Sequence, residues 1–282
     1  MTPHPASVAA RGFYGEPPRE LPWSSFEAER RATVRQGMHQ MFVGPTQSGK
    51  TVLCRVNVRD RDFVVVWGTK KRDDSLQAYV DEGYVRINRW PREHVRSGKR
   101  QVLTTTQLVK ASNGRLTEKP YRFERDETGK LRVILWPDFQ SLSDLRNYND
   151  DFRKCLEDAY VLGGWSIVID EMLWATRRTG LGLNERITEL AFGAASNKVT
   201  LYMCMQRPTG MERTTWSSIS DAYVFKCGVI DDIRELAALS TVDPRDAVTA
   251  IRTRISRHRF LHLPTRGQSL GWSISEVDPR VI

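Results

Sequence analysis

The sequence has few cysteines and no long hydrophobic run, and both absences narrow the classes of protein to which it can belong. Its four cysteines lie far apart in largely apolar surroundings and form no C-x-x-C pair, so we expect buried, reduced thiols rather than a disulfide framework. No apolar stretch approaches the length of a transmembrane helix, and the N-terminus has no hydrophobic signal core. These features predict a cytoplasmic protein without a membrane span.

Histidine is also scarce, and acidic residues are outnumbered by basic ones. Of the five histidines, only His258 and His262 lie close together, and no acidic or cysteine ligand is near them, so we expect no metal site there. The 43 Lys and Arg residues against 34 Asp and Glu residues give a net charge of +9, which favours a polyanionic partner. A chain of 282 residues with 40% hydrophobic residues can form a substantial core.

The most specific motif present is a complete phosphate-binding loop (P-loop), G-x-x-x-x-G-K-[ST], at residues 44–51. It follows the apolar stretch Met41–Val43 and precedes a segment that can open a helix, which is the context that the motif requires. In such a loop, successive backbone N–H groups cradle phosphate oxygens at the positive end of the helix. The predicted nucleotide-binding residues are Gly44, Pro45, Thr46, Gln47, Ser48, Gly49, Lys50, Thr51 and Val52.

Two side chains of the loop and two later carboxylates predict the chemistry of ATP hydrolysis. Lys50 is expected to reach the terminal phosphates of ATP, and the Thr51 hydroxyl to bind Mg²⁺. Asp170 and Glu171 follow the apolar stretch Ser166–Ile169, at the end of a predicted parallel strand, where ligands bind in open α/β sheets. Asp170 is expected to hold Mg²⁺ through its water shell, and Glu171 to polarise the water that attacks the γ-phosphate.

Predicted strands and helices alternate along the chain, which indicates parallel strand pairing with right-handed crossovers. The fold class is therefore α/β: a P-loop NTPase of the additional-strand type, with a mostly parallel central sheet flanked by helices. Predicted strands cover residues 41–43, 62–67, 84–87, 132–136, 166–169, 199–205, 222–227 and 259–263. Predicted helices start after the P-loop and cover residues 75–83, 144–162, 185–195, 231–239 and 244–255, the last of them capped by Asp243.

Two stretches fall outside this alternation. Residues 1–35 are rich in Pro, Arg and Glu and predict an N-terminal extension, which leaves residues 36–282 as the P-loop domain. Residues from about 100 to 131 predict an insertion. There Tyr121–Arg125, a turn at Asp126–Gly129 and a strand from Leu131 indicate a β-hairpin at the edge of the sheet.

A third motif, Gln206-Arg207-Pro208, follows the predicted strand at residues 199–205. At the tip of that strand, the Gln206 side chain can touch the γ-phosphate or the attacking water. The order of P-loop, acidic strand and Gln-Arg-Pro over about residues 40–265 resembles the HerA/FtsK superfamily of DNA-translocating ATPases. Within it, the chain is most similar to the short viral genome-packaging ATPases, and the stretches Val64–Lys70 and Arg89–Pro91 add to that likeness.

The resemblance implies a strand order, an assembly and a substrate. The Gln206 strand should lie between the strands that precede Lys50 and Asp170, and a homo-oligomeric ring, commonly a hexamer, should thread double-stranded DNA. For a packaging motor, the resemblance adds a capsid vertex or portal as partner and the host cytoplasm or the virion as location. Conjugation, plasmid transfer and antiviral complexes use the same motor and stay open. A nucleotide-gated scaffold with little turnover is a further alternative, against which Glu171 counts.

In many members of the superfamily, an arginine near a Gly-Arg pair in the helix before the Gln-Arg-Pro strand acts across the subunit interface. Here residues 190–197 contain no arginine. We therefore expect the trans-acting arginine elsewhere, at Arg186 or at the alternatives Arg177, Arg178 and Arg213.

Three groups of basic residues are candidates for contacts with DNA phosphates, which would give little base specificity. The alternative for each group is a solvated face whose charge is balanced by nearby acids. The groups are Arg252, Arg254, Arg257, Arg259 and Arg266; Lys70, Lys71 and Arg72; and Arg86, Arg89, Arg92, Arg96, Lys99 and Arg100.

Overall fold

A computed structural model describes residues 13–91, 103–208, 211–265, 271–278 and 280, in which twelve strands form one sheet. The strands are β1 Arg19–Glu20, β2 His39–Val43, β3 Phe63–Trp67, β4 Val85–Ile87, β5 Leu103–Lys110, β6 Leu116–Phe123, β7 Leu131–Leu135, β8 Trp165–Ile169, β9 Thr200–Met205, β10 Ile219–Phe225, β11 Arg259–Pro264 and β12 Ser273–Glu276. The helices are α1 Trp23–Thr33, α2 Lys50–Val58, α3 Asp74–Asp81, α4 Leu142–Arg146, α5 Asn149–Leu162, α6 Met172–Thr176, α7 Asn184–Asn197, α8 Arg213–Ser217, α9 Ile230–Ala238 and α10 Pro244–Thr253.

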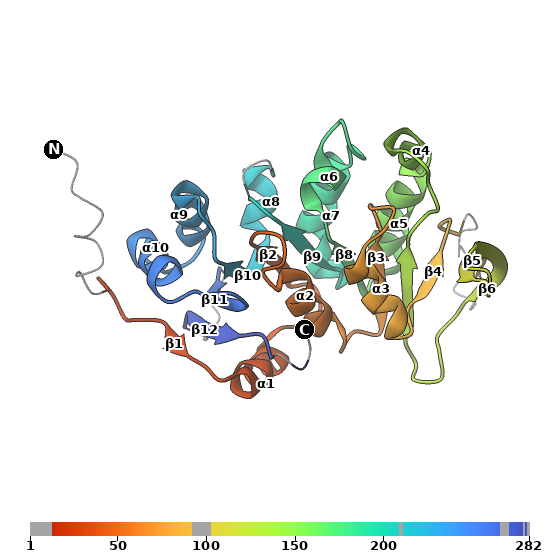
Figure 1. The fold of residues 1–282 in the computed structure, drawn as a ribbon. Coiled ribbons are helices and arrows are strands. Elements are labelled where there is room, and N and C mark those ends of the chain that lie inside the picture. Colours follow the sequence, from red (N-terminus) through yellow and green to blue (C-terminus); the bar gives the residue numbers. More distant parts are fainter. Residues whose placement is uncertain (1–12, 92–102, 209–210, 266–270, 279, 281–282) are drawn as a thin grey trace.

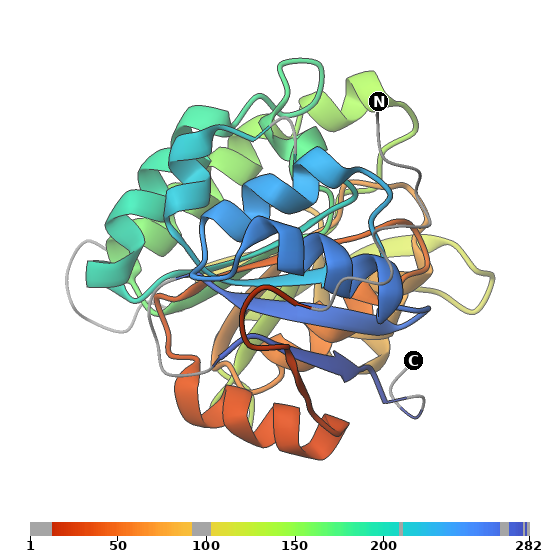
Figure 2. The same cartoon turned by 90° about the vertical axis from the view of Figure 1, so that its left-hand side faces the viewer.

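Helices cover both faces of this sheet, so the molecule has three layers (Figures 1 and 2). The strand order is β1-β12-β11-β10-β2-β9-β8-β3-β7-β4-β5-β6. All neighbours from β10 through β2, β9, β8, β3 and β7 to β4 pair in parallel, and the antiparallel pairs lie toward the two ends. The predicted α/β class with a mostly parallel central sheet is therefore confirmed.

The central strands are buried on both faces, which explains why they appear in the sequence as nearly continuous apolar runs. On β2, Met41 and Val43 belong to the core that α5, α7, α9 and α10 cover, whereas Phe42 belongs to the core under α1, α2 and α3. Alternate residues of β3, β8, β9 and β10 are divided between the two cores in the same way.

The strand order places three ligand-binding segments at one edge of the sheet. β9 lies between β2 and β8, with Val43 opposite Met205 and Ile169 opposite Met203. The position expected for the Gln206 strand is thus confirmed. Since these strands run in parallel, the P-loop, the Asp170–Glu171 pair and Gln206 all follow carboxyl ends that meet at the same edge.

Two predictions about secondary structure were wrong. A hairpin does lie at the sheet edge, but it pairs β5 with β6 in antiparallel fashion, whereas the strand from Leu131 is β7, between β3 and β4. The turn at Asp126–Gly129 exists, with Asp126 N donating to Lys130 O at 2.6 Å, yet its two strands lead to different places in the sheet. The helix predicted at 144–162 is divided into α4 and α5, since Ser141 caps a separate short helix.

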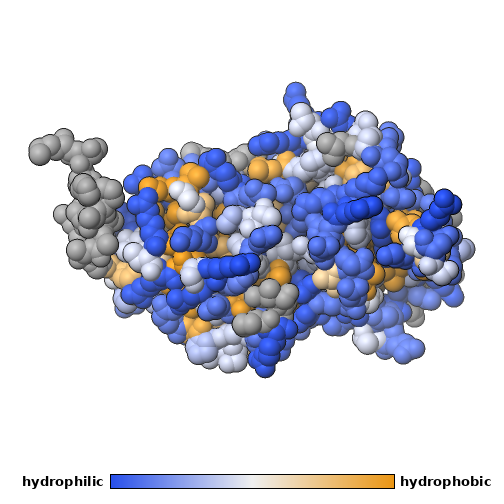
Figure 3. Space-filling view, in the orientation of Figure 1, coloured by the Kyte–Doolittle hydropathy of each residue, from blue (hydrophilic) through white to orange (hydrophobic). Residues whose placement is uncertain are grey.

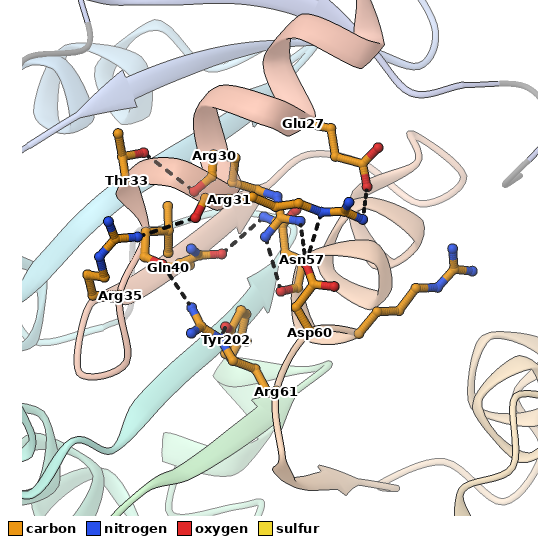
Figure 4. A network of polar contacts seen from close by, with 12 residues as sticks. Glu27, Arg30, Arg31, Thr33, Arg35, Gln40, Asn57, Asp60, Arg61 and Tyr202 are labelled. Atoms are coloured by element: carbon orange, nitrogen blue, oxygen red, sulfur yellow. Dashed lines mark hydrogen bonds and ion pairs between the residues drawn. The ribbon is translucent and has the colours of Figure 1, made fainter. Parts of the chain in front are cut away.

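The stretch predicted as an extension contributes β1 and α1 to the described structure, and its role as a separate extension stays a prediction. β1 pairs with β12, and α1 is tied to the end of α2 by a polar network (Figure 4). In that network, buried Arg30 donates to the Asn57 carbonyl oxygen at 3.3 Å and pairs with Asp60 at 3.3 Å, while Asn57 donates to Gln40 of β2 at 3.0 Å. The N-terminal segment is therefore attached to the strand that carries the P-loop.

The surface gives no sign of a membrane-spanning element in the part of the chain that the structure describes. No helix there is both long enough and apolar enough to cross a bilayer. Figure 3 shows hydrophobic residues as separate patches among hydrophilic ones on the face that it presents.

Candidate functional site

The P-loop connects β2 to α2 and borders a cavity of about 200 Å³ at the carboxyl edge of the sheet. Gly49 caps α2 with a φ of 100°, a left-handed conformation that glycine adopts without a steric cost. Gly44 is needed for a different reason, because a Cβ there would lie 2.7 Å from Phe225 Cβ. The cavity is lined by Thr46, Gln47, Ser48, Gly49, Lys50, Thr51, Val52, Lys70, Ser75, Asp170, Glu171 and Gln206.

Most of the predicted site residues therefore meet in one place. Of the nine predicted P-loop residues, Gly44 and Pro45 do not line the cavity, although both shape it. Gly44 N donates to Met205 O at 3.1 Å and so joins the loop to the end of β9. The Pro45 carbonyl accepts a hydrogen bond of 3.3 Å from Lys50 Nζ, so this ammonium lies over the loop.

The oxygen atoms beside the loop fit a magnesium ion. Thr51 Oγ1 donates to Asp170 Oδ1 at 2.9 Å, and Asp170 is only 6% exposed. A hydroxyl and a carboxylate are hard oxygen ligands of the kind that Mg²⁺ prefers. Ser48 lines the same cavity, and its buried Oγ has no hydrogen-bond partner among the described residues. That orphaned group and the amides at the start of α2 also suit an anionic ligand.

Lys70 is a member of this site that the sequence did not reveal. It follows β3, and its Nζ lies 3.0 Å from Asp170 Oδ2 and 2.9 Å from Asp73 Oδ2. Burial by itself lowers the pKa of the Lys70 ammonium, but the two carboxylates raise that pKa above its ordinary value overall. The signal that would have found it is topological: β3 is the parallel neighbour of β8, so their following loops are adjacent.

Glu171 and Gln206, which follow β8 and β9, also line this cavity. Burial raises the pKa of the Glu171 carboxyl above its usual value, and the charges of Lys70, Lys50 and Arg177 counteract this in part. Gln206 is exposed at the end of β9. Its neighbour Arg207 pairs with the fully buried Asp232 of α9 at 3.1 Å, which fixes the loop after β9 to that helix.

The candidates for an arginine acting in trans lie in several places. Arg186 does not line the P-loop cavity; it pairs with Glu189 at 2.9 Å and borders another hollow, of about 380 Å³, between α5 and α7. Arg177 and Arg178 are exposed just after α6, and Arg177 is near enough to lower the pKa of Glu171. Arg213 begins α8. The structure of a single subunit does not test whether any of these arginines acts across a subunit interface. That role stays a prediction for all four.

The three basic groups are not equivalent in the structure. Arg86 lies over the Trp136 ring and Arg89 pairs with Asp151, so both have structural contacts, while Arg92, Arg96, Lys99 and Arg100 lie outside the described residues. Within the described residues, Arg252 and Arg257 are exposed without an ion-pair partner. Arg254 and Arg259, in contrast, both pair with Glu20, and Arg266 is outside the described residues.

This chain has similar solved structures but no similar sequence among the families and curated proteins compared with it. The sequence matches no protein-family model and no curated protein sequence. Among solved structures, one match is the genome-packaging NTPase B204 from Sulfolobus turreted icosahedral virus 2, in complex with sulfate. The TM-score is 0.51 at 11% identity, and the match covers 87% of this chain and 98% of that chain. The structure of the same NTPase in complex with AMPPCP matches with a TM-score of 0.51 at 12% identity and covers 86% of this chain and 98% of that chain.

A bacterial secretion ATPase shares the same architecture. The cytoplasmic domain of the type VII secretion ATPase EccC from Thermomonospora curvata matches with a TM-score of 0.52 at 13% identity, over 95% of this chain but 30% of that chain. This chain has the fold of FtsK/HerA-type ATPases. In this FtsK/HerA-type fold, the chain places its P-loop and its two acidic residues on strands that flank the Gln206 strand.

Proposed function

We propose that this protein is an ATP-hydrolysing motor that moves double-stranded DNA as a homo-oligomeric ring. The observation that carries the proposal is the single cavity in which Lys50, Thr51, Asp170, Glu171 and Gln206 meet. These residues come from the ends of β8 and β9 and from the start of α2, in a chain with the FtsK/HerA-type fold.

The chain's own groups account for nucleotide binding and for the activation of water. The P-loop amides and the Lys50 ammonium would hold the β- and γ-phosphates of ATP. Thr51 and Asp170 would hold Mg²⁺, which when bound neutralises charge on the phosphate oxygens. Glu171 would accept a proton from the attacking water, and Gln206 would orient that water or the γ-phosphate. Burial of Glu171 supports this role, since it makes the carboxylate a better proton acceptor.

Genome packaging is the version of this function that we favour. B204 is described as a genome-packaging NTPase, and the match with this chain covers 98% of the B204 chain. A motor for conjugation, plasmid transfer or an antiviral complex would use the same cavity and differ in its partner. A capsid vertex or portal is the partner that packaging requires.

Movement along DNA separates a translocase from a nucleotide-gated scaffold. We expect faster ATP turnover with linear duplex DNA than without it, and displacement of a third strand annealed to that duplex only when ATP is present. The Glu171→Gln protein serves as the control, because it should bind DNA and ATP yet displace nothing. Triplex displacement followed by gel electrophoresis measures the outcome, and turnover without any displacement by the wild-type protein would contradict translocation.

DNA binding should depend steeply on salt and hardly on sequence. A protein that neutralises several phosphates loses roughly 10³-fold or more in affinity between about 50 and 200 mM salt. Because Arg252 and Arg257 are exposed and form no ion pair with another described residue, the double variant Arg252→Ala/Arg257→Ala should reduce the slope of log affinity against log salt by about 2. The matched control is Arg254→Ala, since Arg254 already has structural contacts with Glu20 and with the Phe13 ring. Fluorescence anisotropy gives the slopes, and equal slopes in all three proteins would place the DNA surface elsewhere.

A further inference from the structure

The loop between β3 and α3 presents a single ammonium group to the P-loop cavity. Lys70 Nζ lies 3.0 Å from Asp170 Oδ2 and 2.9 Å from Asp73 Oδ2. The carboxylates are largely buried, with side-chain exposures of 7% for Asp170 and 8% for Asp73, whereas the Lys70 side chain is 46% exposed. Lys70 is thus a cation at the rim of the cavity that reaches inward to two buried anions.

The backbone on both sides of Lys70 is held firmly, so the position of the ammonium is set by the fold. Trp136 Nε1 donates to the Lys70 carbonyl at 2.7 Å. Gly68 packs against the same indole so closely that a Cβ there would lie 2.5 Å from Trp136 Cγ. Asp73 caps α3 by accepting a hydrogen bond from Ser75 N at 2.8 Å. The four-carbon stem of Lys70 is the flexible part of this arrangement.

Both oxygens of Asp170 are occupied in this state. Oδ1 accepts the hydrogen bond from Thr51, and Oδ2 faces Lys70. A buried carboxylate without a partner is unfavourable, so Lys70 supplies the charge that stabilises Asp170. A metal ion held by Thr51 and Asp170 would bring a second cation to the same carboxylate and repel the ammonium. The phosphate groups of a nucleotide in the cavity are the anions to which a displaced ammonium could turn, because Lys70 lines that cavity together with Lys50.

We propose that Lys70 is an exchangeable cation of the nucleotide site: it neutralises Asp170 in the nucleotide-free protein and moves to the phosphates of the bound nucleoside triphosphate when Mg²⁺ takes its place. The proposal rests on nucleotide binding at the P-loop cavity. It assigns to a residue of the same chain a positive charge near the phosphates, in addition to that of Lys50. It also makes Lys70 a competitor of Mg²⁺ for Asp170.

The test measures binding of fluorescent mant-ATP by anisotropy, once in EDTA and once over a titration with free Mg²⁺. At saturating Mg²⁺, Lys70→Met should weaken binding by roughly tenfold or more, because one charged hydrogen bond to phosphate is lost. In EDTA the loss should be smaller, because Lys70 of the wild-type protein then stays with Asp170. The same variant should reach half-maximal Mg²⁺-dependent binding at a lower Mg²⁺ concentration than the wild-type protein, since no ammonium competes for Asp170. The matched control is Lys71→Met, because Lys71 is exposed and donates to Gln140 outside the cavity.

A second neutral variant separates charge from loop structure. Lys70→Gln can still hydrogen-bond to Asp73 and should behave like Lys70→Met, which also makes it the variant to measure if Lys70→Met does not fold. Equal loss of binding with and without Mg²⁺, or an unchanged Mg²⁺ requirement, would mean that Lys70 only fixes the loop and would overturn the proposal. Absence of binding under all conditions, in wild type and in Lys71→Met, would instead refute the proposed function.

Discussion

Replacing Glu171 by glutamine should lower the rate of ATP turnover by about 10²–10⁴-fold and leave ATP binding nearly unchanged. The amide has the shape of the carboxylate but cannot accept a proton from water, so the step that is lost is the activation of the nucleophile. Binding should persist because Lys50, Thr51 and the P-loop residues, which also line the cavity, are unchanged. The variant should therefore accumulate in an ATP-bound form.

Two measurements check this result. Steady-state phosphate release gives the rate, and binding of mant-ATP gives the affinity. Glu185→Gln is the matched control, because Glu185 is an exposed residue in the first turn of α7 and does not line the cavity. If the Glu171→Gln protein turns over ATP at nearly the wild-type rate, Glu171 is not the group that activates water.

Replacing Lys50 by alanine should weaken ATP binding and also remove turnover, because the Lys50 charge is needed both for binding and for the charge that develops on the transferred phosphoryl group. The Lys50 ammonium lies over the loop at the Pro45 carbonyl and is the group placed to meet the β- and γ-phosphates. Loss of its charged hydrogen bonds should weaken binding by about ten- to a hundredfold. Lys71→Ala, which removes an exposed lysine, should bind as the wild-type protein does. Unchanged mant-ATP affinity in Lys50→Ala would contradict the assignment of the cavity.

The Lys50→Ala protein also tests whether a ring shares its sites between subunits. A trans-acting arginine is worth roughly 10³–10⁵ in rate in other NTPases. If Arg186 is that residue, Arg186→Ala should be inactive alone but regain activity when mixed with Lys50→Ala, because some interfaces then combine an intact site with an intact arginine. Arg177, Arg178 and Arg213 are examined in the same way. Full activity of all four single variants would exclude the shared site, as would turnover per subunit that is unchanged by dilution to monomers.

The sequence predicted those site residues that belong to a motif of fixed spacing or directly follow an apolar strand. The P-loop has a fixed spacing, and Asp170 and Gln206 each follow an apolar strand, so the parallel sheet brings them together. Lys70 has no such signal, because its neighbours Lys71 and Arg72 make it part of a basic run. Its partner Asp170 is distant in sequence, and only the adjacency of β3 and β8 makes them neighbours.

Two parts of the fold could not be predicted from the sequence. They are the pairing of the strands around the turn at Asp126–Gly129 and the burial of a charged residue in α1. Strand pairing is not encoded in a turn: Asp126–Gly129 turns the chain, but β6 pairs with β5 and β7 pairs with β3 and β4. Helix α1 lacks a clear apolar stripe because its buried residues are Phe26 and Arg30. A buried arginine looks like a surface residue in a sequence, and its partners Asn57 and Asp60 become evident only in space.

The position of β2 in the sheet sets the order in which the protein can mature on the ribosome. β2 and the P-loop end by residue 51, but the neighbours of β2 are β9 and β10, which lie at residues 200–225. At about 5–20 residues per second, synthesis reaches β9 only about 10 to 30 s after β2 has been made. During that interval, β2 and its loop have no strand on either side. Nucleotide can therefore stabilise the nascent chain only after β9 and β10 have been made, and a chain terminated before β9 carries the complete P-loop without the sheet that supports it.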